Sequence, residues 1–82
     1  LSMENNEFQL KLFGLFAEQA GTNSLSCSCL PNRDALLEAV FTQYPLWRSM
    51  PWALAVNHQL VFENQDLNQT DELALMPPFS GG

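Results

Sequence analysis

A helix in the middle of the chain is the feature that most constrains the fold. Asn32 is a good N-cap after Pro31, and Pro45 ends the helix after Tyr44. Apolar residues recur between these signals at helical spacing and form one stripe: Leu36, Leu37, Val40, Phe41 and Tyr44. A chain of 82 residues has room for a single core. We therefore expect one domain, in which the other segments cover this stripe.

The first segment to do so is a strand over residues 8–13. Phe8, Leu10 and Leu12 alternate with polar residues and share one face, as in a half-buried strand. The same parity places Phe13, a large aromatic residue, on the opposite face. There it is either covered by a neighbouring loop or part of an interface.

The remaining segments are a short helix and four strands. We expect the helix at residues 15–20, with Gly21 as its C-terminal cap, and the strands at 24–30, 52–56, 59–62 and 73–76. The strand at 24–30 is predicted to pair antiparallel with the first. In the last strand, Leu73 and Leu75 point inward and leave Ala74 and Met76 outward.

The connections between these segments are expected to be irregular. In residues 45–51 and just beyond, Trp47 and Trp52 are predicted to cover one end of the core. Asn57 and His58 form the turn of a hairpin, since Asn tolerates the positive φ of a tight turn. The polar residues 63–69 carry Leu67 as an apolar anchor.

This order of elements predicts an α+β fold of the ubiquitin-like β-grasp type, with a mixed sheet packed on one main helix. We expect residues 1–7 to be a disordered leader, of which Leu1-Ser2 is a cloning remnant. Residues 8–76 would form the β-grasp domain, and residues 77–82 an extended tail.

The charge balance argues against two classes of partner. Nine acidic residues face three basic ones, so the formal net charge is −6. Such a surface is repelled by phosphate backbones and anionic lipids, and we expect neither nucleic-acid nor membrane binding. No segment resembles a signal peptide or a membrane span, which predicts a cytoplasmic protein.

Few residues have the chemistry of a metal or nucleophile site. Cys27 and Cys29 lie on one face of a predicted strand and are poorly placed to bridge each other. His58 is the only other candidate of this kind, and we interpret it as an exposed turn residue. We therefore expect no metal, no bound cofactor, and two ordinary thiols in a reducing compartment.

The tail has a distinctive composition. Pro77-Pro78 favours a stiff, extended exit from the last strand, and Phe79, Ser80, Gly81 and Gly82 follow. Glycines leave no side chain around the final carbonyl carbon, so a nucleophile or a narrow channel can approach it closely.

Several of these stretches together resemble the small, sulfur-carrying subunit of molybdopterin synthase. The matching residues are Leu12-Phe13-Gly14, Glu18, Gly21-Thr22, Ala55-Val56-Asn57, Leu60-Val61, Asp71-Glu72-Leu73-Ala74 and Pro77-Pro78-Phe79-Ser80-Gly81-Gly82. The last two are the most specific. The chain departs from the family pattern at Ala17, where a basic residue is common, and at His58, where glycine is frequent.

The resemblance implies a sulfur carrier of molybdenum cofactor biosynthesis. An ATP-dependent activating enzyme would adenylate the Gly82 carboxylate, and a sulfur donor would convert it to a thiocarboxylate. The tail, residues 77–82, would then enter the large subunit, where the sulfur attacks a cyclic pterin precursor. The chain would be part of an enzyme without being catalytic alone, in an assembly of two small and two large subunits.

The resemblance also implies an interface. Positions that match Phe13, Leu60 and Met76 form an apolar patch that docks on the large subunit. Parity independently places Phe13 and Met76 on the face away from the helix, whereas the face of Leu60 depends on the register of the hairpin.

Three other functions share the fold. Sulfur carriers for thiazole synthesis or transfer-RNA thiolation share the fold and the Gly-Gly end, although Pro77-Pro78 with Ser80 fits the pterin carrier better. The chain could also be a protein modifier that forms an isopeptide bond through Gly82 with a substrate lysine. A β-grasp interaction module with an incidental Gly-Gly end is the third alternative.

Overall fold

The computed structural model describes residues 7–78. Its elements are β1 (Glu7–Leu12), α1 (Leu15–Ala20), β2 (Ser24–Ser28), α2 (Arg33–Gln43), the 3-10 helix η1 (Pro45–Ser49), β3 (Ala53–Val56), β4 (Gln59–Leu60) and β5 (Leu73–Met76). The predicted order of strands and helices is confirmed. Glu7 corrects the expected leader boundary, because it pairs with Ser28 in β1.

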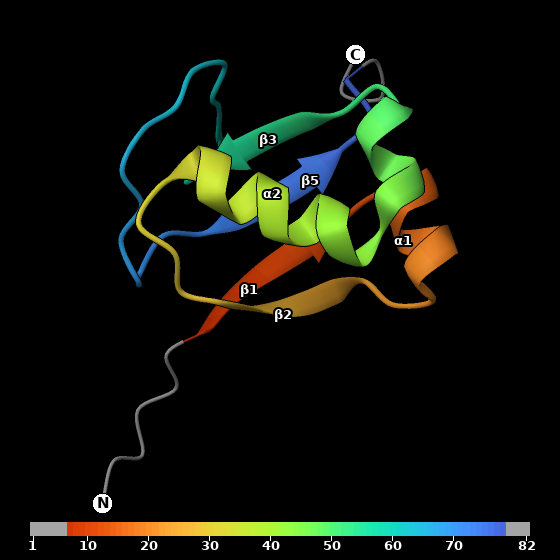
Figure 1. Ribbon diagram of the computed structural model, residues 1–82, viewed down its shortest axis with the longest axis horizontal. Coiled ribbons are helices and arrows are strands. Elements are labelled where there is room, and N and C mark those ends of the chain that lie inside the picture. The colour runs from red at the N-terminus through yellow and green to blue at the C-terminus, as the bar shows by residue number, and fades with distance from the viewer. Residues whose placement is uncertain (1–6, 79–82) are drawn as a thin grey trace, which may run out of the picture.

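The strands form one five-stranded mixed sheet in the order β2-β1-β5-β3-β4. β1 and β5 run parallel at the centre, and the other pairs are antiparallel. Figure 1 shows α2 lying across one face of this sheet. This is the ubiquitin-like β-grasp fold that the sequence predicted.

Alternation along the strands separates the two faces of the sheet. Phe8, Leu10 and Leu12 are buried under α2, and the residues between them are exposed. Leu73 and Leu75 are buried in the same way in β5. The core lies between α2 and one face of the sheet, and no helix of the described residues covers the opposite face.

The ends of α2 follow the predicted signals. The Asn32 side chain accepts a hydrogen bond from the Ala35 N–H at 2.9 Å, and the helix stops before Pro45. Leu36, Leu37 and the rest of the predicted stripe as far as Phe41 are buried, and Tyr44 caps the helix half-buried.

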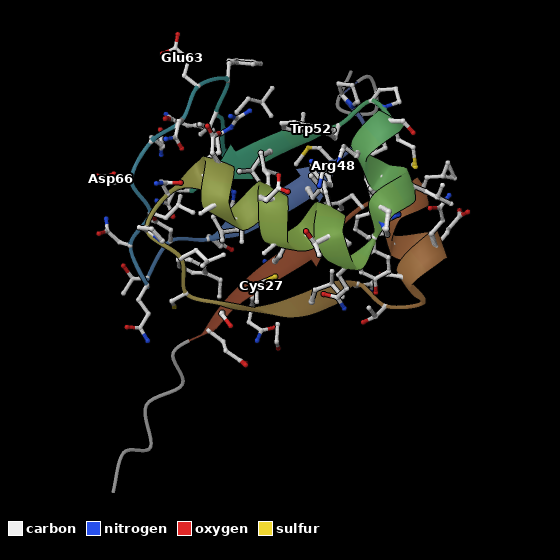
Figure 2. All side chains as sticks on the ribbon, in the orientation of Figure 1. Cys27, Arg48, Trp52, Glu63 and Asp66 are labelled. Atoms are coloured by element: carbon white, nitrogen blue, oxygen red, sulfur yellow. The ribbon has the colours of Figure 1, made fainter. Side chains whose placement is uncertain are left out.

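The segment after Pro45 is more regular than the sequence suggested, since η1 is a 3-10 helix. Trp47 on η1 is buried as expected, stacked on Tyr44 and edge-on to Phe16, and its ring N–H donates to Gln19 at 2.9 Å. Trp52 (labelled in Figure 2) is half-buried: its ring packs against Phe41 of α2 at the border of the core, and the Arg33 guanidinium lies over it, 5.2 Å from the ring centre.

Three strands are shorter than predicted. β2 covers residues 24–28 rather than 24–30, and Ser28 pairs with Glu7, the first described residue of β1. β3 and β4 cover residues 53–56 and 59–60 rather than 52–56 and 59–62, since the chain turns away after Val61 and Phe62 is exposed.

The long connection between β4 and β5 is held to the start of α2. Figure 2 labels Glu63 and Asp66 on this connection. The N–H groups of Arg33 and Leu67 donate to the carbonyls of Gln65 and Pro31, and Leu67 is buried, as predicted.

The hairpin turn between β3 and β4 has two residues with positive φ, Asn57 at 53° and His58 at 71°. Asn57 is held on both sides: its side chain accepts from the Glu72 N–H and donates to Asp71, both at 2.9 Å. His58 has no such backbone role, and its side chain is 80% exposed.

We predict that His58→Gly stabilises the domain. Glycine removes the steric cost of positive φ, whereas the lost contact with Glu72 is an exposed pair of small value. The expected gain is about 0.5–1 kcal/mol. Urea unfolding measures it. Asn57→Gly is the matched control and should destabilise, because it removes two side-chain hydrogen bonds. If both substitutions lower stability, relief of strain at His58 is worth less than its contact with Glu72.

Candidate functional site

The face of the sheet opposite α2 has a polar half and an apolar half. On β1 and β2, Gln9 donates to Ser26 at 2.8 Å and accepts from Ser24 at 2.9 Å, so these side chains satisfy one another. On β5 and β3 the corresponding residues are small or apolar, namely Ala53, Ala55, Ala74 and Met76. The apolar half is the part of this face suited to contact with another protein.

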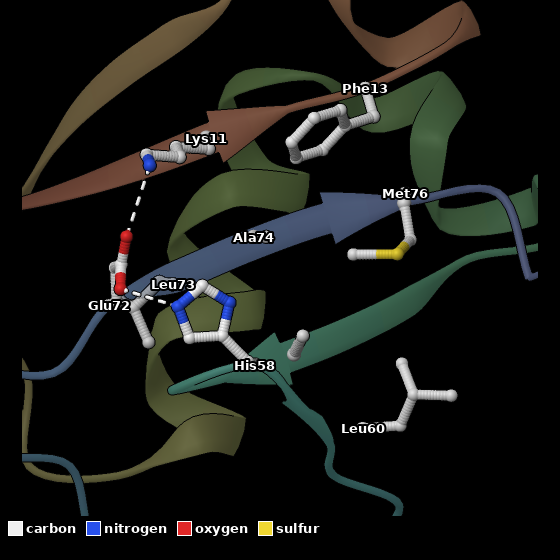
Figure 3. Close-up of a pocket in the computed structure, with 9 residues that line it drawn as sticks. Lys11, Phe13, His58, Leu60, Glu72, Leu73, Ala74 and Met76 are labelled. Carbon is white, nitrogen blue, oxygen red and sulfur yellow. Dashed lines mark hydrogen bonds and ion pairs between the residues drawn. The ribbon is translucent and has the colours of Figure 1, made fainter. Parts of the chain in front are cut away.

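The three residues predicted to form an interface lie together on this apolar half. Phe13, Leu60 and Met76 line one hollow of about 300 Å³ (Figure 3), which Ala55 and Ala74 also line. Phe13 and Leu60 are 48% and 49% exposed, and Met76 is half-buried. We call this feature the docking hollow.

Strand register explains why residues so distant in sequence meet here. Leu60 pairs with Ala55, and Ala55 pairs with Ala74, so all three side chains share a face. The register that pairs Leu12 with Leu75 brings Phe13 beside Met76, and the Phe13 N–H donates to the Leu75 carbonyl at 3.1 Å. The sequence alone did not decide on which face of the sheet Leu60 lies; the pairing of Leu60 with Ala55 places it on the face opposite α2.

Charged side chains close one edge of the docking hollow. Lys11 Nζ lies 3.1 Å from Glu72 Oε2, and His58 Nε2 lies 3.0 Å from Glu72 Oε1 (Figure 3). The hydrogen bond from Lys11 and, after it, the electrostatic interaction with His58 hold the pKa of Glu72 below its usual value. An apolar lining beside a charged edge is the usual anatomy of a protein interface.

Sequence reasoning misses this charged edge. It interprets His58 only as an exposed turn residue and gives Lys11 and Glu72 no role. The available signal was parity, because Lys11 shares a face with Phe13 and Glu72 shares one with Ala74 and Met76.

The chain leaves the docking hollow directly into the predicted tail. Met76 is the last residue of β5, Pro77 is half-buried, and Pro78 is exposed. Phe79, Ser80, Gly81 and Gly82, the other predicted tail residues, lie outside the described residues.

The described residues hold no ready-made metal centre. Within residues 7–78, no three His, Cys, Asp or Glu side chains come close enough to share an ion. Cys27 and Cys29 are free thiols, and Cys27 lies on β2 (Figure 2). Burial, with a smaller contribution from Glu7, raises the pKa of the Cys27 thiol, which disfavours the reactive thiolate.

None of the helices within residues 7–78 has the length and apolar character needed to cross a membrane.

Comparison with known proteins identifies the family. The sequence profile of the ThiS family matches residues 10–82. No curated protein sequence matches the chain significantly. The structure is similar to the solution structure of small archaeal modifier protein 1 from Methanosarcina acetivorans, with a TM-score of 0.75 and 23% sequence identity over 93% of this chain and 96% of that one.

The profile match supports a ubiquitin-like sulfur carrier and does not single out the molybdopterin synthase subunit, which was the finer expectation from sequence. It covers β1 from Leu10, the docking hollow and the tail. The chain belongs to the ThiS family, whose members are ubiquitin-like sulfur carriers that act with partner enzymes.

Proposed function

We propose that this chain is the sulfur-carrying small subunit of a molybdopterin synthase. The observation that carries the proposal is the position of the docking hollow, which shares Met76 with the end of β5 and so adjoins the tail. A partner that covers Phe13, Leu60 and Met76 lies within reach of residues 77–82. Pro77-Pro78 with Ser80 favours the pterin carrier over the thiazole and transfer-RNA carriers.

The chemistry takes place at Gly82. A free carboxylate is a poor electrophile, so an activating enzyme joins it to AMP and releases pyrophosphate from ATP. A persulfide donor then displaces AMP, and a second thiol cleaves the resulting S–S bond to leave the thiocarboxylate. In the large subunit this sulfur attacks the cyclic pterin precursor, and water regenerates the Gly82 carboxylate.

The carrier and its partner enzymes supply different parts of the reaction. This chain supplies the docking hollow and the carrier tail, and the acid–base and substrate-binding groups belong to the large subunit. ATP is a substrate of the activating enzyme and is not bound by this chain. We propose two small and two large subunits in the assembly.

Two linked experiments test the proposal. The chain is incubated with activating enzyme, ATP and a sulfur donor, and tandem mass spectrometry then locates sulfur in fragments beyond Met76. This choice of fragments matters because replacing oxygen with sulfur increases the mass by nearly the same amount as oxidation of a methionine. The loaded chain is next mixed with the large subunit and the pterin precursor. A different result would reject the pathway: sulfur is found on Gly82 and no molybdopterin forms, but the loaded chain supports thiazole synthesis or transfer-RNA thiolation by the corresponding enzymes. The chain would then be a sulfur carrier of another pathway.

A second candidate function is protein modification through an isopeptide bond from Gly82 to a lysine. The similarity in fold to small archaeal modifier protein 1 favours it. Activation is the same, but an amine replaces the persulfide as the nucleophile. Cyanogen bromide cleaves after Met76 and would leave Pro-Pro-Phe-Ser-Gly-Gly attached to the modified lysine. Finding this remnant on lysines of cellular proteins would establish the modifier function.

A further inference from the structure

The base of the tail is held against the body of the domain. Pro77 lines a small apolar hollow of about 270 Å³, together with Leu15, Phe16, Met50 and Pro51. These residues come from α1 and from the segment that follows η1. Pro77 is half-buried there, whereas Pro78 is exposed. This hollow is separate from the docking hollow, which contains none of these five residues.

Gly14 closes the other side of the Pro77 ring. A methyl group added to Gly14 would lie 2.9 Å from Cγ and 3.1 Å from Cδ of Pro77. Gly14 also has φ 60° and ψ −135°, a conformation available essentially to glycine alone. Because the proline ring is fused to its own backbone, it cannot swing aside as a long side chain would. A group added at Gly14 therefore forces either the Gly14 segment or the start of the tail to move.

Hydrogen bonds fix the backbone on both sides of this contact. Phe13, just before Gly14, donates to the Leu75 carbonyl at 3.1 Å, and Met76, just before Pro77, pairs with Ala53. The Gly14 carbonyl accepts from the Glu18 N–H at 3.2 Å in the first turn of α1. Gly14 and Pro77 are therefore brought together by the central strands and by α1.

We propose that Gly14 and Pro77 act as positioning residues, which set the point and direction in which the tail leaves the domain. This inference rests on the proposed function, in that it concerns delivery of Gly82 to a partner enzyme. The five residues that follow Pro77 can span at most about 18 Å. A change in direction at Pro77 therefore displaces Gly82 by several ångströms, and small misplacements of a reacting group slow a reaction strongly.

This role differs from docking in its kinetic signature. Weaker docking on a partner enzyme raises KM, because a higher concentration of the chain is then needed to form the complex. A misdirected tail leaves docking unchanged and lowers the rate once the complex has formed. Substitutions at Gly14 or Pro77 are therefore expected to lower kcat for adenylation of Gly82, with little change in KM.

The central test compares Pro77→Ala with Pro78→Ala. Both substitutions remove one proline ring from the tail, but only Pro77 contacts Gly14. We expect kcat for ATP-dependent activation to fall at least tenfold further for Pro77→Ala than for Pro78→Ala, with KM changed less than threefold in either. Equal effects of the two substitutions would overturn the proposal.

Gly14→Ala and Gly21→Ala provide a second comparison. Both glycines have positive φ, but no described atom lies within 4 Å of a methyl group added at Gly21. We expect Gly14→Ala to lower kcat at least tenfold and Gly21→Ala to leave it unchanged. Circular dichroism and the thermal midpoint exclude unfolding of either variant. If the Gly14→Ala variant does not fold, the comparison of Pro77→Ala with Pro78→Ala tests the proposal on its own.

A measurement without any enzyme separates this inference from the proposed function. In the unmodified chain, nuclear Overhauser effects are expected between the Gly14 Hα protons and the Pro77 ring, and they should be lost in Pro77→Ala but kept in Pro78→Ala. Their absence in the wild type would overturn the contact. If the nuclear Overhauser effects are present but no activating enzyme acts on Gly82, the contact between Gly14 and Pro77 exists but the proposed function is rejected. The proposed role of the contact in delivering Gly82 is then rejected as well.

Discussion

Removal of Gly82 will abolish formation of the thiocarboxylate and leave the stability of the domain unchanged within about 0.5 kcal/mol. The chemical reason follows from the proposed function: the acyl-adenylate would form on the Gly82 carboxylate, and a carboxylate moved back to Gly81 would stop short of the partner's reactive groups. The physical reason is that, within residues 7–78, the last buried core residue is Leu75, seven positions before Gly82. Mass spectrometry of the terminal fragment and thermal unfolding measure the two effects.

A chain extended by one glycine beyond Gly82 is the matched control. It keeps every residue of the tail but displaces the carboxylate in the opposite direction, so it should also fail to carry sulfur while folding normally. Sulfur transfer by either variant at the rate of the wild type would show that Gly82 is not the site of activation. A large loss of thermal stability on removal of Gly82 would instead show that the tail is part of the core.

Substitution of Phe13, which follows β1, and of Phe8, which lies within β1, will separate the effect on partner binding from the effect on folding. Phe13→Ala should weaken the complex with the partner enzyme by about 2 kcal/mol, or roughly 30-fold, because it removes an aromatic anchor from the docking hollow. Its effect on folding should be small, since Phe13 is half exposed. Phe8→Ala makes the same chemical change at a residue that is 2% exposed, and should cost about 3–5 kcal/mol of folding free energy.

Isothermal titration with the large subunit and urea unfolding give the two quantities for each variant. Met76→Ala should follow Phe13→Ala, with a larger effect on binding than on folding. The opposite order for Phe13, with a large loss of stability and unchanged affinity, would make it a core residue and remove the docking hollow from the proposed interface.

Much of the fold was predictable because short-range patterns specify it. Alternation assigned the inward faces of β1 and β5, and the Asn32 cap and Pro45 bounded α2. Phe13 and Met76 were placed away from the helix by parity alone. The tail was recognised from Pro77-Pro78 and the two terminal glycines, whose role stays a prediction.

The features that could not be predicted from the sequence depend on strand register and on contacts between segments that are distant in the sequence. The face of Leu60 required the pairing of β4 with β3, and η1 appeared only where Trp47 packs between Phe16 and Tyr44. The charged edge needed Lys11, His58 and Glu72 to be brought together by three segments. The contact of Gly14 with Pro77 is of the same kind, because nothing near Gly14 in the sequence points to a proline 63 positions later.

The central position of β5 has a mechanical consequence. β5 is hydrogen-bonded to β1 on one side and to β3 on the other, and the tail continues from its end. Tension applied to the tail along the strand therefore loads both ladders in shear, so that their hydrogen bonds resist together instead of opening one after another. A force on the carboxyl-terminal end must therefore break both ladders before β5 can leave the sheet.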